Sequence, residues 1–266
     1  MTIRSASAGG GAGLFPLLAA CYANTPTTMT QALFDRYYYS KPDFEDGTRR
    51  FLRVCREQIP AGAEILEIGA GPTNGYSKAF SDLGTLTGLD VDPEVKNNQW
   101  LSRAFVFDGG VMPFADASFD ACISNFVAEH LEHPVEHFKE VARVLRPGGV
   151  YCLRTPNLFH YVTLGASLMP HSLHLLLANR LRSRAKDAHD PYPTWYRANS
   201  RGKLKKLCRI AGLRPAVFTM VEPEPSYGRA HALLFYPMML YERTVNLSPV
   251  FSGFRVTILL SVRKPA

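Results

Sequence analysis

Hydrophobic residues in the first 155 positions fall in short runs that alternate with amphipathic segments. Each run is bounded by glycine, proline or aspartate, a pattern typical of strands buried on both faces of a parallel sheet. Two more runs rich in branched and aromatic residues stand near the C-terminus. The predicted strands are 64–69, 84–89, 104–107, 119–124, 150–155, 214–221 and 254–262.

The segments between the runs have helical periodicity, with apolar residues on one side and charged residues on the other. Glycine and proline stop the first and third of them, at residues 60–62 and 146–149. Strands that alternate with helices predict an α/β fold, with a mostly parallel sheet covered by helices on both faces. The predicted helices are 48–58, 76–83, 135–145 and 201–211.

Residues 156–200 interrupt this alternation, because they are rich in histidine, proline and aromatic residues and show no clear strand. We expect an insertion between the fifth and sixth strands that binds a substrate or forms a lid. Within it, residues 173–186 combine leucines with arginines and predict a basic amphipathic helix. Such a helix either lies on an anionic membrane surface or covers a site with its basic face in water.

The chain has 266 residues, of which 46% are hydrophobic, so a folded globular protein is expected. Its five cysteines form no CxxC pair, which argues against a disulfide framework or zinc site and favours the reducing cytoplasm. Residues 1–155 carry 14 basic and 18 acidic residues, whereas residues 156–266 carry 16 and 5. The basic second part can attract nucleic acid, anionic lipid or a phosphorylated molecule, or simply provide a solvated surface.

The first 28 residues form a predicted flexible segment that precedes a domain spanning 29–266. The stretch Leu18–Cys21 is similar to a lipoprotein cleavage site, but the apolar run before it is short and contains Pro16. Met29 is an alternative start in our interpretation.

The clearest chemical motif is LEIGAGPTNG (66–75), in which a predicted strand runs into a glycine turn that opens a helix. Glu67 stands two residues before Gly69, where a carboxylate would repel the pyrophosphate of a nicotinamide dinucleotide and attract a cationic group. Asp90, at the end of the second strand, could accept both hydroxyls of a ribose. Asp108 follows the third strand and could accept from the amine of adenine. Each aspartate alone could equally cap a helix or a turn, but together they favour a cationic nucleoside without phosphates.

At this point residues 64–155 resemble a class I S-adenosylmethionine-dependent methyltransferase, of the small-molecule type that includes quinone-biosynthesis enzymes. The resemblance rests on four motifs, and it implies a Rossmann-like seven-stranded sheet and S-adenosyl-L-methionine as cofactor. One departure affects the shape of the glycine loop, because Thr73 replaces a glycine found in many relatives. The motifs are LEIGAGPTNG (66–75), GLDVDPE (88–94), DGGVMPFADASFDACISNFVAEHLEHP (108–134) and EVARVLRPGGVYCLRTPN (140–157).

The resemblance also implies a role for individual residues of the cofactor site. Glu67 would organise the pocket for the methionine end, with Gly69 and Gly71 packed against the cofactor. Asp90 would hold the ribose. Asp108 and Gly109 would flank the adenine, and Asn125 would lie near the sulfonium.

The methyl acceptor is less well defined by the sequence. His130 is the candidate general base or acceptor-orienting residue, although a structural histidine would fit the same position. The segment after the fourth strand lacks the Asn/Asp-Pro-Pro-aromatic motif of amino methylation, and no acidic cluster is spaced for a metal. We expect O-methylation of a small or lipid-linked acceptor, such as a glycan or glycolipid. The alternatives are a nucleic-acid methyltransferase and a binding module that has lost methyl transfer.

Overall fold

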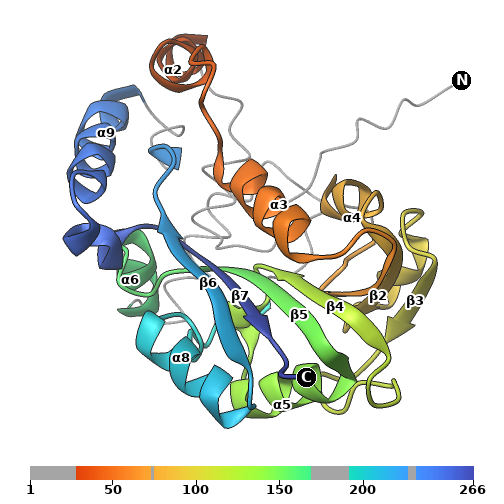
Figure 1. Ribbon diagram of the computed structural model, residues 1–266. Coiled ribbons are helices and arrows are strands. Elements are labelled where there is room, and N and C mark those ends of the chain that lie inside the picture. Colours follow the sequence, from red (N-terminus) through yellow and green to blue (C-terminus); the bar gives the residue numbers. More distant parts are fainter. Residues whose placement is uncertain (1–27, 73–74, 169–191, 227–231) are drawn as a thin grey trace, which may run out of the picture.

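The computed structural model describes residues 28–72, 75–168, 192–226 and 232–266 (Figure 1). The predicted flexible segment, except for Thr28, and the predicted basic helix 173–186 lie outside the described residues. The same holds for residues 169–191, about half of the predicted insertion 156–200. Among the helices described, none is long and apolar enough to cross a membrane.

A seven-stranded sheet forms the centre of the molecule, in the order β3-β2-β1-β4-β5-β7-β6. Only β7 runs antiparallel to its neighbours β5 and β6, so the sheet is mostly parallel, as predicted. The strands are β1 (Ala63–Ile68), β2 (Gly84–Asp90), β3 (Arg103–Val106), β4 (Phe119–Asn125), β5 (Leu145–Pro156), β6 (Arg214–Val221) and β7 (Thr257–Arg263).

Helices cover both faces of this sheet (Figure 1). On one face lie α3 (Gly47–Gln58) and α4 (Gly75–Phe80), and on the other lie α5 (Pro134–Val144) and α8 (Arg201–Ile210). Side chains of a strand alternate between the two faces. In β1, Ile65 therefore packs with the α3 core, whereas its neighbour Leu66 packs with the core of α5 and α8.

The structure differs from the sequence-based prediction at two strands and two helices. The prediction that β5 begins at residue 150 was wrong, because Gly148 and Gly149 continue the ladder by bonding the backbone of Lys264. Strand β7 begins at Thr257, since residues 249–254 form the short helix η5 (Pro249–Phe254). The helices α6 (Tyr161–Leu168) and α9 (Ala232–Asn246) were not predicted.

Two N-terminal elements, α2 (Thr28–Phe34) and η1 (Asp35–Tyr39), pack against α9 beyond the edge of the sheet. Phe34 and Phe235 are fully buried, and their ring centroids lie 5.1 Å apart in an edge-to-face contact. Tyr38 donates to Glu242 of α9 over 2.8 Å. The start of the described chain and α9 therefore form one layer together. The remaining short helices are η2 (Pro93–Asn97) and η3 (Ala128–His130).

We predict that Phe138→Ala lowers the free energy of unfolding by about 3 to 5 kcal/mol, because this fully buried ring fills the core between α5 and the sheet. The matched control is Phe159→Ala, which truncates a ring that is 53% exposed and should cost far less. Denaturant titration measures both values. Equal losses in the two variants would contradict the assignment of Phe138 to the core.

Candidate functional site

The glycine turn after β1 lies at the edge where the parallel strands end, which is where open α/β sheets bind ligands. Gly69 and Gly71 have φ angles of +75° and +63°, in the left-handed region that glycine tolerates. A Cβ atom on Gly69 would stand only 2.3 Å from Cγ2 of Val127. The backbone thus approaches the segment after β4 closely, and a side chain on Gly69 would prevent this.

Asp90, at the end of β2, holds this turn in place. Its Oδ2 accepts from the backbone N–H of Gly71 over 2.8 Å, and its Oδ1 accepts from Asp92 N over 2.9 Å. Each carboxylate oxygen has two lone pairs, so both keep capacity to accept from a ligand. The sequence-predicted residues Gly71 and Asp90 are therefore in direct contact.

Glu67 points from β1 into the buried side of the turn, where its exposed fraction is 3%. The Ser77 hydroxyl donates to its carboxyl group, and the amide of Asn98 donates to Ser77 Oγ over 2.9 Å. The second oxygen, Oε2, is buried with no hydrogen-bond partner among the described residues. The pKa of Glu67 is raised to about 8, mainly by burial; the hydrogen bond from Ser77 lowers it and the charge of Asp90 adds a smaller increase, and both are included in that value.

Asn125 ends β4, the strand beside β1. Its side-chain Oδ1 is also buried and has no hydrogen-bond partner in the described part of the chain. A buried acceptor without a donor costs free energy. Two of them, on Glu67 and Asn125 at adjacent strand ends, form an acceptor pair suited to a positively charged ligand.

Asp108 and Gly109 lie in an exposed turn after β3. Asp108 Oδ1 accepts from Gly110 N over 2.9 Å, and Gly109 has a φ angle of +89°. The turn is tied to the site through the backbone, because Phe107 N donates to the carbonyl of Asp90 over 3.0 Å. Asp108 thus lies just after β3, the strand next to β2, and its side chain bonds within its own turn.

His130 lies in the segment after β4, and its Nδ1 is 2.9 Å from the carbonyl of Pro193. Since a carbonyl only accepts, Nδ1 carries the proton and Nε2 is the basic nitrogen of the neutral ring. The Tyr192 ring stands edge-on to the imidazole, with centroids 6.2 Å apart. Burial raises the pKa of Tyr192, and so do the charges of Asp92 and Asp90. Tyr192 therefore contacts His130 and is close enough to Asp90 and Asp92 to be affected by their charges.

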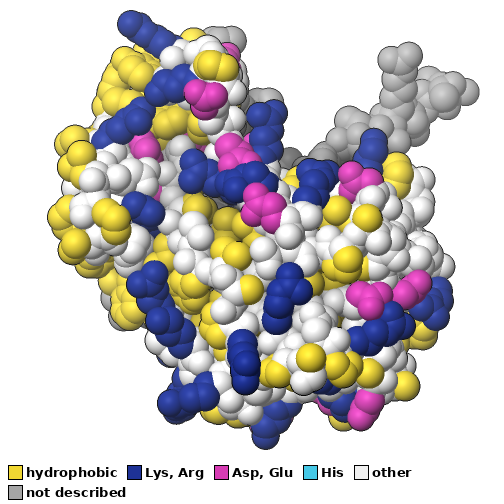
Figure 2. Space-filling model, viewed as in Figure 1, with side chains coloured by type: hydrophobic (Ala, Val, Ile, Leu, Met, Phe, Trp, Pro, Cys, Tyr) yellow, Lys and Arg dark blue, Asp and Glu magenta, His cyan; other side chains and the backbone are white. Residues whose placement is uncertain are grey.

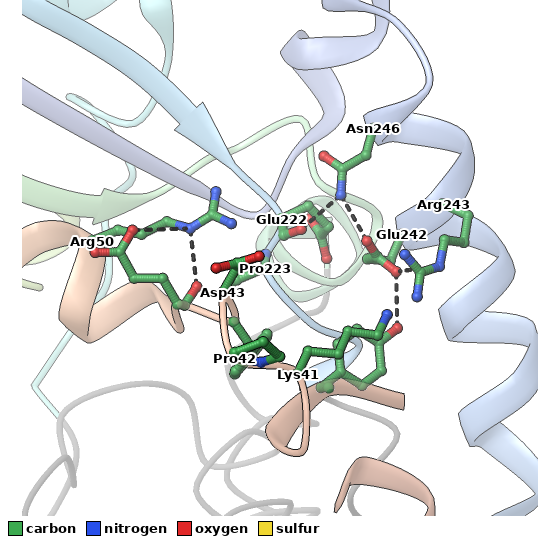
Figure 3. Close-up of a pocket in the computed structure, with 12 residues that line it drawn as sticks. Lys41, Pro42, Asp43, Arg50, Glu222, Pro223, Glu242, Arg243 and Asn246 are labelled. Carbon is green, nitrogen blue, oxygen red and sulfur yellow. Dashed lines mark hydrogen bonds and ion pairs between the residues drawn. The ribbon is translucent and has the colours of Figure 1, made fainter. Parts of the chain in front are cut away.

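A polar pocket of about 400 Å³ opens between η1, the end of β6 and α9 (Figure 3). Three cations line it together with several carboxylates. Asn246 of α9 donates to Glu242 Oε1 and to the carbonyl of Glu222, each over 2.8 Å. The cations are Lys41, Arg50 and Arg243, and the carboxylates include Asp43, Glu45, Glu222 and Glu242.

Arg154 connects this pocket with the turn after β4. Its guanidinium lies 4.4 Å from the centroid of the Phe126 ring, next to Asn125, and donates to Thr48 Oγ1 over 3.1 Å. A Cβ atom on Gly47 would meet both Arg154 and Pro223, which lines the pocket. The sequence analysis missed Arg154, although a lone arginine inside a buried strand was an available indication.

The sequence model of a family described as "Methyltransferase domain" matches residues 66–153. The match identifies residues 66–153 as a methyltransferase domain, and this range includes Glu67, Asp90 and Asn125. An uncharacterized methyltransferase of Mycobacterium tuberculosis is 38% identical over 108 residues, which is 38% of this chain and 42% of the relative. A second, from Mycobacterium sp. strain JLS, is 36% identical over 106 residues. The match to these relatives covers less than half of their length.

Two solved structures share the fold at low sequence identity. An S-adenosylmethionine-dependent methyltransferase from Mesorhizobium loti has a TM-score of 0.51 at 14% identity, covering 82% of this chain and 98% of that one. The cyclase SpnF has a TM-score of 0.52 at 16% identity, covering 91% and 98%. A methyltransferase and a cyclase are thus similar to this chain to the same degree, so the chemistry of the methyltransferase domain has to be argued from its site.

We predict that Glu67 makes stability depend on pH. Between its ordinary pKa of 4.5 and its folded value of about 8, the unfolded chain releases a proton that the folded protein keeps. The contribution of Glu67 to the free energy of unfolding is therefore fully present below pH 4.5. It is lost as the pH rises from 4.5 to about 8, by at most about 1.4 kcal/mol per pH unit.

The variant Glu67→Gln cannot ionise, so its free energy of unfolding should fall less than that of the wild type between pH 5 and pH 8. Urea titrations of both proteins at these two pH values measure the difference. An equal decrease in the free energy of unfolding of both proteins between the two pH values would show that Glu67 keeps an ordinary pKa.

Proposed function

We propose that the protein transfers a methyl group from S-adenosyl-L-methionine to a small or lipid-linked acceptor. The observation that carries this proposal is the pair of buried oxygens, Glu67 Oε2 and Asn125 Oδ1, beside a glycine turn tied down by Asp90. A ligand with two positive centres and no phosphate matches such a pair. The bound cofactor supplies a methyl group activated by a positively charged sulfur.

The proposed roles of the cofactor residues follow from their positions at the sheet edge. Glu67 receives the ammonium group of the methionine end, and Asn125 lies beside the sulfonium. Asp90 accepts the ribose hydroxyls, with Gly69 and Gly71 giving the ligand close access to the backbone. Asp108 and Gly109 take the adenine, in a turn exposed enough to admit a ring.

For the acceptor we propose an oxygen nucleophile, as in the hydroxyl of a glycan or glycolipid. The pocket between η1 and α9 supports this, since its charged and amide side chains suit a molecule rich in hydroxyl groups. Methyl transfer is an in-line displacement, so the main task of the site is to hold the nucleophile, the methyl group and the sulfur in one line. His130 removes the hydroxyl proton through Nε2, while its Nδ1–H bond to Pro193 fixes the ring. A lipid-linked acceptor also implies contact with an anionic membrane surface.

Cofactor binding tests the first half of the proposal. Asp90→Asn should weaken the binding of S-adenosylhomocysteine by about 10- to 100-fold, because a charged acceptor of two hydroxyl bonds is lost. Asp92→Asn is the matched control, since Asp92 lies two residues away and its exposed carboxylate caps η2. Isothermal titration calorimetry measures both. Equal affinities of the wild type and Asp90→Asn would refute the assigned ribose site.

Transfer of a labelled methyl group tests the second half. With radiolabelled S-adenosylmethionine and a cell extract fractionated into lipids, glycans and nucleic acids, we expect the wild type to label the lipid or glycan fraction. His130→Ala should reduce this labelling by about 100-fold or more and leave S-adenosylhomocysteine affinity unchanged. The control is His133→Ala, on an exposed residue nearby. Undiminished labelling by His130→Ala would exclude His130 as the base, and label confined to nucleic acids would overturn the acceptor class.

A further inference from the structure

Residues 192–199, here called the 192–199 segment, lie against the ends of β4 and β5 and are fixed there by hydrogen bonds. At the end of β5, the side chain of Asn199 donates to Thr155 Oγ1 over 2.7 Å. In the turn after β4, the backbone N–H of Trp195 donates to the carbonyl of Glu129 over 2.8 Å. The segment therefore presents its side chains in defined positions at the sheet edge that carries the glycine turn.

The three aromatic residues of the 192–199 segment have different surroundings. The ring of Tyr196 is buried in a small core. The ring of Trp195 is covered by the guanidinium of Arg197, which lies 4.7 Å from its centroid. Tyr192 is 49% exposed, and within the part of the chain that the structure describes its hydroxyl makes no hydrogen bond. Of the three rings, Tyr192 is thus the one available to a ligand.

A series of short contacts connects the ring of Tyr192 to the glycine turn. Its ring meets the imidazole of His130 edge-on, with centroids 6.2 Å apart. The backbone N–H of His130 donates to the carbonyl of Val127 over 2.9 Å. Val127 in turn stands so close to Gly69 that a Cβ atom there would lie 2.3 Å from its Cγ2. Tyr192 therefore belongs to the surroundings of the cofactor site, although it lies outside the matched range 66–153.

Tyr192 is also near the carboxylates that follow β2. Burial raises the pKa of its phenol, and the charges of Asp92 and Asp90 raise it further. Asp90 is the residue that holds Gly71 of the glycine turn through a 2.8 Å hydrogen bond. The ring thus stands near the carboxylate assigned to the ribose as well as beside the proposed base, His130.

We infer that Tyr192 is a cofactor-binding residue, whose ring covers the nucleoside of S-adenosyl-L-methionine beside Asp90. An exposed aromatic ring offers an apolar face to an adenine or a ribose, and the phenol hydroxyl can bond a ribose hydroxyl. The nucleoside is favoured over the methionine end, because Tyr192 lies near the end of β2, whereas Glu67 and Asn125 end β1 and β4. The inference rests on the proposed function and adds a contact from outside the matched domain.

Calorimetric titration of the full-length protein with S-adenosylhomocysteine tests the inference. Tyr192→Ala should weaken binding by about 5- to 100-fold, the range expected when an aromatic ring that stacks on a base is truncated. Tyr192→Phe keeps the ring and should lose far less affinity. Because the ring is half exposed, both variants should unfold at the temperature of the wild type.

The matched control is Tyr236→Ala, which truncates a ring that is 51% exposed and should leave binding unchanged. Tyr236 belongs to α9, which lies beyond the opposite edge of the sheet from β2 (Figure 1). Figure 2 shows exposed hydrophobic side chains gathered over that end of the molecule, so the control removes an aromatic ring of similar exposure far from the glycine turn.

Nitration by tetranitromethane, followed by mass spectrometry of peptides, detects the contact directly. The rings of Tyr192 and Tyr236 are exposed to nearly the same extent, so both should react in the free protein. Saturating S-adenosylhomocysteine should slow the nitration of Tyr192 at least about tenfold and leave that of Tyr236 unchanged. A ring that only supported the fold would gain no protection from the ligand.

Equal affinities of the wild type and Tyr192→Ala would overturn the inference, and so would nitration of Tyr192 that the ligand does not slow. Reduced methyl transfer by Tyr192→Ala at unchanged cofactor affinity would assign the ring to the acceptor instead. If Asp90→Asn loses binding and Tyr192→Ala keeps it, the inference fails and the proposed function stands. A wild type that does not bind S-adenosylhomocysteine would refute both.

Discussion

A carboxyl group buried at the end of β1 is the constraint around which the candidate site is arranged. Burial of Glu67 is unfavourable for its charged form, and this raises its pKa to about 8. On one side of the carboxyl group, Ser77 donates a hydrogen bond to Glu67 and Asn98 donates one to Ser77, which offsets part of the cost of burial. The other side keeps an unpartnered oxygen. A cationic ligand would satisfy it and favour the ionised form, so ligand affinity and the protonation of Glu67 are linked.

The mostly parallel sheet brings the other components to the same edge. Strand β7 lies between β5 and β6 and is antiparallel to both, so β6 runs parallel to β5. The residues after β6 therefore leave the sheet at the same edge as those after β1 and β4. The glycine turn and the polar pocket therefore share one edge, with Arg154 between them. The layer formed by α2, η1 and α9 then closes the pocket with buried polar contacts and turns the apolar side of α9 outward.

The sequence predicted all seven strands and four helices on the sheet faces, because buried strands and amphipathic helices have distinct periodicities. It did not predict α9. Leu233, Tyr236 and Leu240 of that helix lie on its outer face, whereas Glu242 is buried on the inner face beside Phe235 and bonds Tyr38. Apolar residues on both faces and a buried carboxyl group give no amphipathic pattern from which to predict the helix. The contact of Gly71 with Asp90 could be anticipated, since both follow strands that pair in parallel. The contact partners of Asn98, Tyr192 and Arg154 could not be anticipated, since they come from other segments of the chain.

The sequence by itself determined the domain class and the chemical types at the strand ends, since glycines, carboxylates and strand periodicity are local properties that a motif records. The tertiary structure alone decided which polar atoms remain unpartnered, which carboxyl group is buried deeply enough to keep its proton, and which hydrophobic residues stay outside the core. Burial and hydrogen bonding depend on contacts between segments as distant as Tyr38 and Glu242, and these exist only once the chain has folded.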